Sequence, residues 1–524
     1  MSSNNNIANI CRQILLHYCW LGLCLVSCDL EIEPEQTVTP EEFFSTSKNL
    51  HPALMGVYDA CQDMFDHIML LDAISDNATA TIEEPDYHWF GQGTLNSVTG
   101  IIETEYANCF SVIQRSNLLL DNMDAPDEPE SPTAEEKLHI EAEAKVLRAI
   151  AYMRLVYLFG DVPLMERPHT REEILALTRT PISEVIAFIK ENLAEAISIL
   201  EVAPLGEGRL TKLAALGFLA RLQLYEARLG NIEWSEAKLA IELAEWSARQ
   251  GNKGLFSVGD GTDGLANYEQ QFFQTNEDNI EVIWSVKYQL GDKARNPHDS
   301  YYANENELVM SVLPELVAAF YTIDGLPITD TNSIYDPSNP YDNRDPRLEA
   351  TVIVPGASYS NGSKRGTLRE GHNSFSDTDF FLRKYIELER KTEVNEGTID
   401  AIVMRYAELL LMLAEAENEV NGPTRIAQNA INSVRSRVAM PFVASDITKE
   451  EFRTEVIHER RVELAFEEQR WFDLITLGLA EEKIDGIEND LILNRDFVPE
   501  KSELFMIPQF DISLISGFTQ NPGY

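Results

Sequence analysis

The strongest constraint on the fold is a pair of apolar patterns at helical spacing, at Thr211–Leu229 and Trp234–Gln250. Apolar residues recur every three to four positions in both segments, which is typical of helices that bury one face. Gly230 and Gly251 follow the two segments and are typical of helix ends. Small residues line the sides expected to face each other, namely Ala214, Ala215, Ala220, Ala227, Ala237, Ala240 and Ala244. Because small side chains allow close approach, we predict two antiparallel helices in contact.

Helical spacing also extends over much of the remaining chain. Thr133 and Glu136 form a capping-box pattern, and Gly160 stands where a helix-ending glycine is expected. Further helices are predicted at 104–123, 133–159, 181–200, 404–420, 425–438 and 449–468. Repeated helical pairs of this kind are typical of tetratricopeptide-like scaffolds. The sequence therefore predicts an all-α fold.

The composition changes between residues 251 and 400, where Gly, Asn, Asp, Pro and Tyr accumulate. Only short strands are expected there, such as Glu281–Val286 and Ala350–Val354. We interpret this region as a loop-rich insert on the helical scaffold. Loops on a rigid frame usually carry recognition.

The first segment of the chain has the pattern of an export signal. Ile14–Val26 is an apolar run that is shorter than the roughly 20 residues of a membrane span. It ends in Leu-Val-Ser-Cys at 25–28, which resembles a bacterial lipobox, so Cys28 is predicted to carry a lipid anchor of diacylglycerol and palmitate. An ordinary cleaved signal is the alternative. We assign residues 1–27 to a lipoprotein signal peptide and 28–40 to a tether rich in Glu, Pro and Thr.

Net charge excludes several classes of partner. The chain has 86 acidic and 42 basic residues, which gives a formal charge of −44. This charge repels nucleic-acid phosphates and anionic lipid head groups, and no basic stripe offsets it. We therefore expect no nucleic-acid partner and membrane contact through the lipid anchor only.

The sequence contains no motif that predicts catalysis, a metal or a cofactor. H-E-x-x-H, Walker and G-x-S-x-G patterns are absent from it. Gly259–Gly264 matches G-x-G-x-x-G, but no strand–turn–helix pattern surrounds it, and Asp260 and Asp263 would repel a pyrophosphate. A glycoside hydrolase remains the alternative enzyme class. Such an enzyme needs a pair of catalytic carboxylates, and among 86 acidic residues the sequence neither excludes nor identifies such a pair.

Several blocks, in this order, resemble the SusD/RagB family over nearly the whole chain after the signal. They are Arg148–Leu164, Arg209–Gly230, Arg405–Glu419, His458–Leu474, Ile507–Gln509 and Gln520–Tyr524. The charged residues in them are predicted to form ion pairs that hold the scaffold, namely Arg148, Arg154, Glu408, Glu415, Arg460, Arg461 and Glu463. Trp471 and Phe472 are predicted to lie in the core.

The resemblance implies an all-helical, tetratricopeptide-like lipoprotein exposed on the cell outer membrane. Proteins of this family sit as lids over a SusC-like, TonB-dependent transporter; most bind oligosaccharides, the RagB branch is associated with peptides, and they are not enzymes. It also implies a helical N-terminal region at 41–250 and a C-terminal region at 251–524, with the loop-rich insert at 251–400. The leading hypothesis is a non-catalytic lid that captures glycans for uptake. A peptide-binding lid and a protein-interaction scaffold without small cargo are the alternatives.

Candidate cargo residues are aromatic and amide side chains in the predicted loops. Sugars stack their C–H faces on rings, while amides and carboxylates bind the hydroxyl groups. Two clusters fit this chemistry and comprise Tyr87, Trp89, Phe90 and Asn96 in the first and Trp284, Tyr301 and Tyr302 in the second. Trp89 is the best single candidate.

The cysteines beyond the signal are few. Cys61 and Cys109 are the only two after residue 28, which argues against a disulfide framework. We expect two free, buried thiols, with a single bridge between them as the alternative.

Overall fold

A computed structural model describes residues 38–65, 68–80, 100–288, 310–361, 364–367, 378–385, 399–488 and 495–524. The chain divides into two units, Met1–Thr46 and Ser47–Tyr524. In the first unit, helix α2 (Pro40–Phe43) begins at a capping box formed by Thr39 and Glu42.

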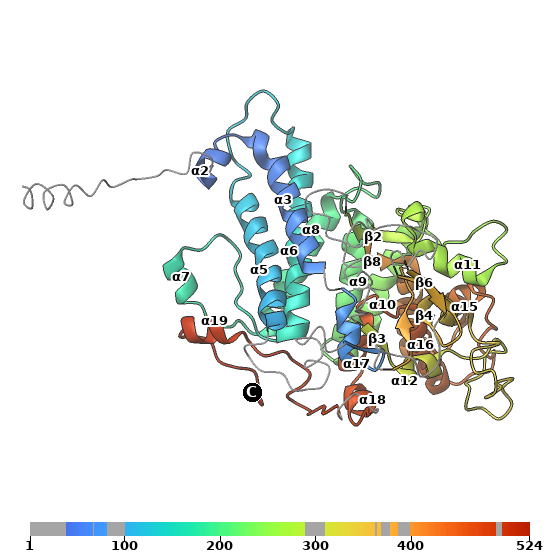
Figure 1. Cartoon of the computed structure of the whole chain (residues 1–524). Coiled ribbons are helices and arrows are strands. Elements are labelled where there is room, and N and C mark those ends of the chain that lie inside the picture. Colours follow the sequence, from blue (N-terminus) through green and yellow to red (C-terminus); the bar gives the residue numbers. More distant parts are fainter. Residues whose placement is uncertain are drawn as a thin grey trace, which may run out of the picture. The chain divides into compact units, whose positions relative to one another are not determined.

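The larger unit is mainly helical, as predicted from the apolar spacing (Figure 1). Its long helices are α3 (Leu50–Phe65), α5 (Gly100–Asp121), α6 (Ala134–Phe159), α8 (Ile182–Ile199), α9 (Lys212–Arg228), α10 (Trp234–Gln250), α14 (Tyr406–Asn421), α15 (Arg425–Arg437) and α16 (Lys449–Glu463). Neighbours in the chain pack on each other from α5 to α6, α6 to α8, α8 to α9 and α9 to α10, and α14 then packs on α10. The core consists of the apolar faces buried between these helices.

The predicted helical pair is α9 and α10. Gly230 lies between them with a φ of 74°, a conformation that favours glycine. Of the small residues predicted to face each other, all are buried except Ala240, which is half-buried. The prediction of a close helical pair is confirmed.

Local capping decides where several helices begin. Thr133 accepts a hydrogen bond from the amide of Glu136, whose carboxylate accepts one from the Thr133 amide, so α6 begins at the predicted capping box. Thr448 and Glu451 do the same at the start of α16. Gly160 ends α6 with a φ of 72°, as predicted.

The predicted helix at 449–468 is too long. Helix α16 ends at Glu463, and after a turn in which Phe466 and Glu468 have φ of 62° and 68°, α17 (Gln469–Thr476) begins. In a continuous helix, successive side chains would point about 100° apart. The turn instead lets Glu467 reach Arg405 while Glu468 reaches Arg154 on helix α6. Tertiary ion pairing therefore overrides the local helical pattern.

The predicted strand at 350–354 is also only partly correct. Its first residues belong to helix α13 (Pro346–Thr351), and strand β4 is limited to Val352–Ile353. The side chain of Asp345 accepts a hydrogen bond from the Arg347 amide, and Pro346 occupies the first helical position. Because these two residues start a helix, the chain stays helical through Thr351, and the strand begins only at Val352.

The strands are short and form three small sheets. One sheet has the order β1 (Ala78–Ala80), β3 (Met310–Val312), β7 (Phe381–Leu382), β4. The others pair β2 (Val282–Val286) with β8 (Ala401–Arg405), and β5 (Ser358–Asn361) with β6 (Lys364–Thr367). The predicted strand at 281–286 corresponds to β2.

Short helices connect these parts, namely α7 (Arg171–Leu175), α11 (Gly264–Glu269), α12 (Pro314–Ala319), α18 (Ala480–Ile484) and α19 (Gln509–Leu514). Cys61 on α3 and Cys109 on α5 are buried, free thiols, as expected. Burial raises the pKa of both thiols, which makes them poor nucleophiles at neutral pH. In the part of the chain that the structure describes, no helix has the length and apolarity to cross a bilayer.

Candidate functional site

The two segments with the predicted cargo residues attach to the scaffold at neighbouring points. Strand β1 ends at Ala80, and residues 81–99 follow it; strand β3 begins at Met310, and residues 289–309 precede it. The two strands are antiparallel, and Ala80 pairs directly with Met310. Opposed residues in such a pair lie about 5 Å apart. One end of this sheet is therefore the attachment point of both segments.

Most of the predicted cargo residues belong to these two segments and lie outside the described residues. They are Tyr87, Trp89, Phe90 and Asn96 in the first segment and Tyr301 and Tyr302 in the second. Their assignment as cargo contacts therefore stays a prediction.

Trp284 is the one predicted cargo residue that lies within the described residues, and it is largely buried in the scaffold. Its side chain lies on β2 and is 3% exposed. The ring packs edge-on against Phe65 at 5.9 Å and Phe218 at 5.7 Å between centroids. Its indole nitrogen donates a hydrogen bond to the Gly208 carbonyl at 3.2 Å. Contact of β2 with α3 and α9 covers most of the ring, and the residue also lines a cavity of about 510 Å³.

The stretch that leads into the first segment is held by buried charges. Asp76 is 2% exposed, and its carboxylate accepts hydrogen bonds from Arg470 at 2.7 and 2.8 Å. Arg461 forms an ion pair with the same carboxylate at 3.0 Å. Although burial opposes ionisation, the two guanidinium groups lower the pKa of Asp76 to about 2. Asp76 is therefore a fixed anion four residues before Ala80.

Main-chain carbonyls of this stretch are bound by a third arginine. Arg495 is fully buried and donates hydrogen bonds to the carbonyls of Ala73, at 2.9 Å, of Ala78, at 2.8 Å, and of Ser75. Asp72 accepts hydrogen bonds from Asn77 at 2.8 Å and from the Phe466 amide at 3.2 Å. We call the set of Arg461, Arg470 and Arg495 with the 72–80 stretch that they bind the charge clamp. It was not predicted from the sequence, where its only signal is the polar run Ser75-Asp76-Asn77 inside a largely apolar stretch.

The second segment is fixed at its start by a smaller polar cluster. The Lys287 ammonium contacts Asp278 and Asp400, both at 2.6 Å, and Gln62 donates to the Lys287 carbonyl at 2.7 Å. Glu277 accepts a hydrogen bond from the Asp400 amide at 3.1 Å. Burial, with the nearby Asp400 carboxylate, raises the pKa of Glu277 to about 7. The charge of this cluster therefore changes near neutral pH.

A larger buried ion network joins the C-terminal helices to β2 and β8. Arg405 is 1% exposed and contacts Glu281 at 2.7 Å, Glu463 at 2.5 Å and Glu467 at 2.6 Å. Arg347 contacts Glu463 as well, at 2.9 Å. Such groups are costly to bury unless all are paired, so the loss of any one of them would leave its partners as unpaired buried charges.

The predicted ion pairs of the family blocks are present, with one exception. The observed pairs are Arg154–Glu105, Arg154–Glu468, Glu408–Arg221, Glu415–Arg228, Arg460–Asp473, Arg461–Asp76 and Glu463–Arg405. Arg148 instead donates to the side-chain oxygens of Asn117 and Asn192, both at 2.6 Å, and to the Glu166 carbonyl at 3.1 Å. Burial lowers the pKa of Arg148 to about 10, although the charges of Glu166 and Glu195 act in the opposite direction. Trp471 and Phe472 are buried, as predicted.

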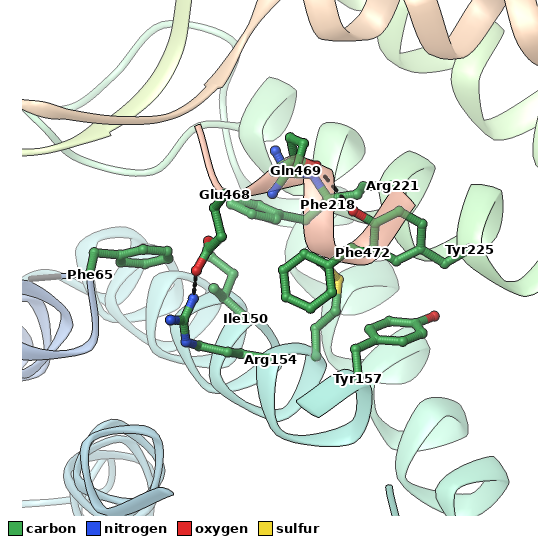
Figure 2. Close-up of a pocket in the computed structure, with 11 residues that line it drawn as sticks. Phe65, Ile150, Arg154, Tyr157, Phe218, Arg221, Tyr225, Glu468, Gln469 and Phe472 are labelled. Carbon is green, nitrogen blue, oxygen red and sulfur yellow. Dashed lines mark hydrogen bonds and ion pairs between the residues drawn. The ribbon is translucent and has the colours of Figure 1, made fainter. Parts of the chain in front are cut away.

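A small cavity lies beside the ion pair between Arg154 and Glu468 and is part of the packed scaffold. Figure 2 shows Arg154 pointing toward Glu468, with the rings of Phe65, Tyr157 and Phe472 around them. The cavity measures about 30 Å³, more than the roughly 10–15 Å³ that one water molecule needs. It is too small for a sugar.

Two larger cavities open elsewhere on the described surface. One, of about 510 Å³, lies between the 202–213 stretch and β2 and is lined by Arg209, Lys253 and Asp278 among others. The second, of about 360 Å³, is lined by residues of α5, α7 and α19. Among the described residues, no three His, Cys, Asp or Glu side chains are grouped to hold a metal ion.

Comparisons with known proteins agree with the fold. Residues 280–524 match the family described as SusD family, and residues 30–224 match the family described as starch-binding and associating with the outer membrane. SusD-like protein P25 of Formosa agariphila is 26% identical over 91% of this chain and 92% of its own length.

Solved structures show the same architecture. A SusD-like carbohydrate-binding protein from Bacteroides fragilis NCTC 9343 superposes with a TM-score of 0.77 at 24% identity, covering 90% of this chain and 99% of its own. A laminarin-binding SusD-like protein gives a TM-score of 0.69 at 23% identity, covering 91% of this chain and 100% of its own. Since the two family matches together span most of the sequence, the chain belongs to the SusD/RagB family.

Proposed function

We propose that this chain is a non-catalytic, lipid-anchored protein of the outer-membrane surface that binds oligosaccharides. It passes them to a SusC-like, TonB-dependent transporter over which it sits as a lid. Cys28 carries the anchor, and Trp89 is the central ring of the cargo site, with Tyr87, Phe90, Asn96, Tyr301 and Tyr302 as its neighbours.

The observation that carries this proposal is the pairing of Ala80 with Met310. It gives the two segments rich in aromatic and amide residues a common attachment point in a chain whose family is described as starch-binding. The described relatives that bind carbohydrate or laminarin support the same class of cargo.

The physical mechanism is capture by stacking on a rigid base. Aromatic rings take the C–H faces of sugars, and amide groups bind the hydroxyls that would otherwise lose their water. The charge clamp on residues 72–80 holds one attachment point, which reduces the entropy lost when cargo binds. Closure over a transporter then requires that cargo contact the closed state more favourably than the open one.

The experiment is a binding screen of the soluble body that starts at Asp29. Starch, laminarin, other polysaccharides, their oligomers and mixed peptides are titrated by calorimetry. We expect binding of at least one glycan and a loss of 10-fold or more in affinity for Trp89→Ala. The matched control is Trp246→Ala, which removes an indole that is 55% exposed on α10, at a distance in sequence from both segments.

The outcomes separate the alternatives. Glycan affinity that falls equally in both variants, or in neither, contradicts the assigned site. Binding of peptides alone moves the protein to the peptide-binding branch. Co-purification of the lipid-anchored protein with a TonB-dependent barrel from outer-membrane extracts tests the transporter, and its absence there contradicts the lid.

A further inference from the structure

The cavity formed by α5, α7 and α19 has the features of a second, separate binding site. In Figure 1, α7 and α19 lie near one end of α5, and residues of all three elements line the same cavity of about 360 Å³. This volume is in the range of pockets that bind small organic molecules. Four of its lining residues are aromatic, namely Tyr106, Phe110, Phe510 and Phe518. None of its lining residues belongs to the proposed glycan site.

Tyr106 supplies an unused polar group in this cavity. Its side chain is 5% exposed, and its hydroxyl has no hydrogen-bond partner among the described residues. The ring is fixed by Phe110 at 4.8 Å and Phe159 at 5.0 Å between centroids. Since buried hydroxyl groups are normally paired, an acceptor or a ligand is expected at this position.

The cavity lining is also acidic, and Arg179, whose charge acts on Tyr106, lies outside that lining. Glu103 and Asp511 are among its lining residues, and no Lys, Arg or His is. Burial, and then the nearby Glu103 carboxylate, raise the pKa of Asp511. Two nearby carboxylates in a partly buried site repel each other, and a positive charge between them stabilises their ionised forms. Phe510 stands 67% exposed in the same lining and adds a ring face at the solvent side.

These features select one class of ligand. The lining is mostly apolar and offers few hydrogen-bond partners, so a polyhydroxylated molecule would leave several hydroxyls unpaired. A positive group on an apolar stem fits both the charge and the apolarity of this lining. The carboxylates and ring faces attract the cation, and the rings cover the stem. We propose that this cavity binds an organic cation, an ammonium or guanidinium group on an apolar stem, with Asp511 and Tyr106 as its polar contacts.

The test compares two probes that differ only in charge, on the full-length protein. Titration calorimetry with 2-phenylethylammonium is expected to give a dissociation constant about 10-fold or more below that of neutral 2-phenylethanol. Asp511→Asn should remove this difference. The control Asp342→Asn, at an exposed acid outside the cavity, should leave it unchanged.

Two further variants keep the test decisive. Ala107→Leu adds bulk at an exposed lining position of α5 and should block both probes without disturbing the core. Tyr106→Phe removes the unpaired hydroxyl, so we expect weaker binding of the cation, by about three-fold, and no loss of thermal stability. Equal affinity for the two probes, or cation binding that survives Asp511→Asn and Ala107→Leu, overturns the proposal.

A final arm identifies the source of the cation. A capped Phe-Lys dipeptide amide presents the same group on a peptide. If it binds more tightly than the free amine and loses that affinity in Asp511→Asn, the site takes side chains of peptides. If it binds more weakly, the site takes free amines.

Discussion

The carboxylate of Asp76 accepts both hydrogen bonds of the Arg470 guanidinium, at 2.7 and 2.8 Å, across 394 residues of sequence. This bidentate pair ties the stretch before residues 81–99 to helix α17. Both side chains are at most 4% exposed, so neither partner has water as a substitute.

Removal of this anion should destabilise the protein strongly. Asp76→Ala leaves Arg470 and Arg461 buried without their carboxylate, and we expect a loss of about 3–5 kcal/mol in the free energy of unfolding. The matched control is Asp59→Ala, which breaks an ion pair with Arg115 whose side chains are 47% and 44% exposed and should cost less than about 1 kcal/mol. Urea unfolding measures both, and equal losses would contradict the clamp.

Stability should fall between pH 5 and 8 because of Glu277. Its pKa is raised from 4.5 to about 7 in the fold, so the folded chain holds this proton more tightly than the unfolded chain. The stabilisation is complete below pH 4.5 and is lost as the pH rises through 7. Glu277→Gln should therefore flatten the decline by about 1–2 kcal/mol in urea unfolding at several pH values. Glu236→Gln, at an exposed position, should keep the wild-type slope.

Two glycines should respond in opposite directions to alanine. A Cβ at Gly264 would lie 2.6 Å from the Val438 carbonyl, which is backbone and cannot move aside, so Gly264→Ala should destabilise by about 1–3 kcal/mol. A Cβ at Gly56 meets nothing within 4 Å on helix α3, and Gly56→Ala should stabilise by about 0.5–1 kcal/mol. Thermal unfolding of the two variants decides this, and a shift of the same sign in both refutes it.

The lipid anchor should depend on Cys28 alone. Cys28→Ser removes the thiol that accepts the lipid, so metabolic labelling with an alkyne palmitate should disappear and the protein should leave the membrane fraction. Cys24→Ser, four residues earlier in the same apolar run, should keep the label. Label that persists in Cys28→Ser, or vanishes in both variants, would refute the assignment.

Helices and their starts could be predicted because their signals are local. The capping boxes at Thr133 and Thr448 and the alanine faces of α9 and α10 need only neighbouring residues to be recognised. The ion-pairing role of the family-block charges could also be predicted, but not their partners. Arg228, for example, lies on α9 and contacts Glu415 and Asp473 far along the chain.

Features that depend on distant contacts could not be predicted. The helix break after Glu463 exists because Glu467 and Glu468 reach different arginines, and no pattern within 449–468 contains that requirement. The pairing of β1 with β3 joins strands of three residues each across about half of the chain. The burial of Trp284 could not be predicted either, because it results from contacts of β2 with α3 and α9, which are distant in sequence.

The fixed pairing of Ala80 with Met310 has an evolutionary consequence. The contacts described for residues 72–80 come from Arg470, Arg461 and Arg495, which lie outside both 81–99 and 289–309. Under the proposed function, a lineage that meets a new nutrient could replace its capture surface piece by piece while the helices and their ion network keep their sequence. Selection for stability and selection for diet would then act on separate parts of one polypeptide.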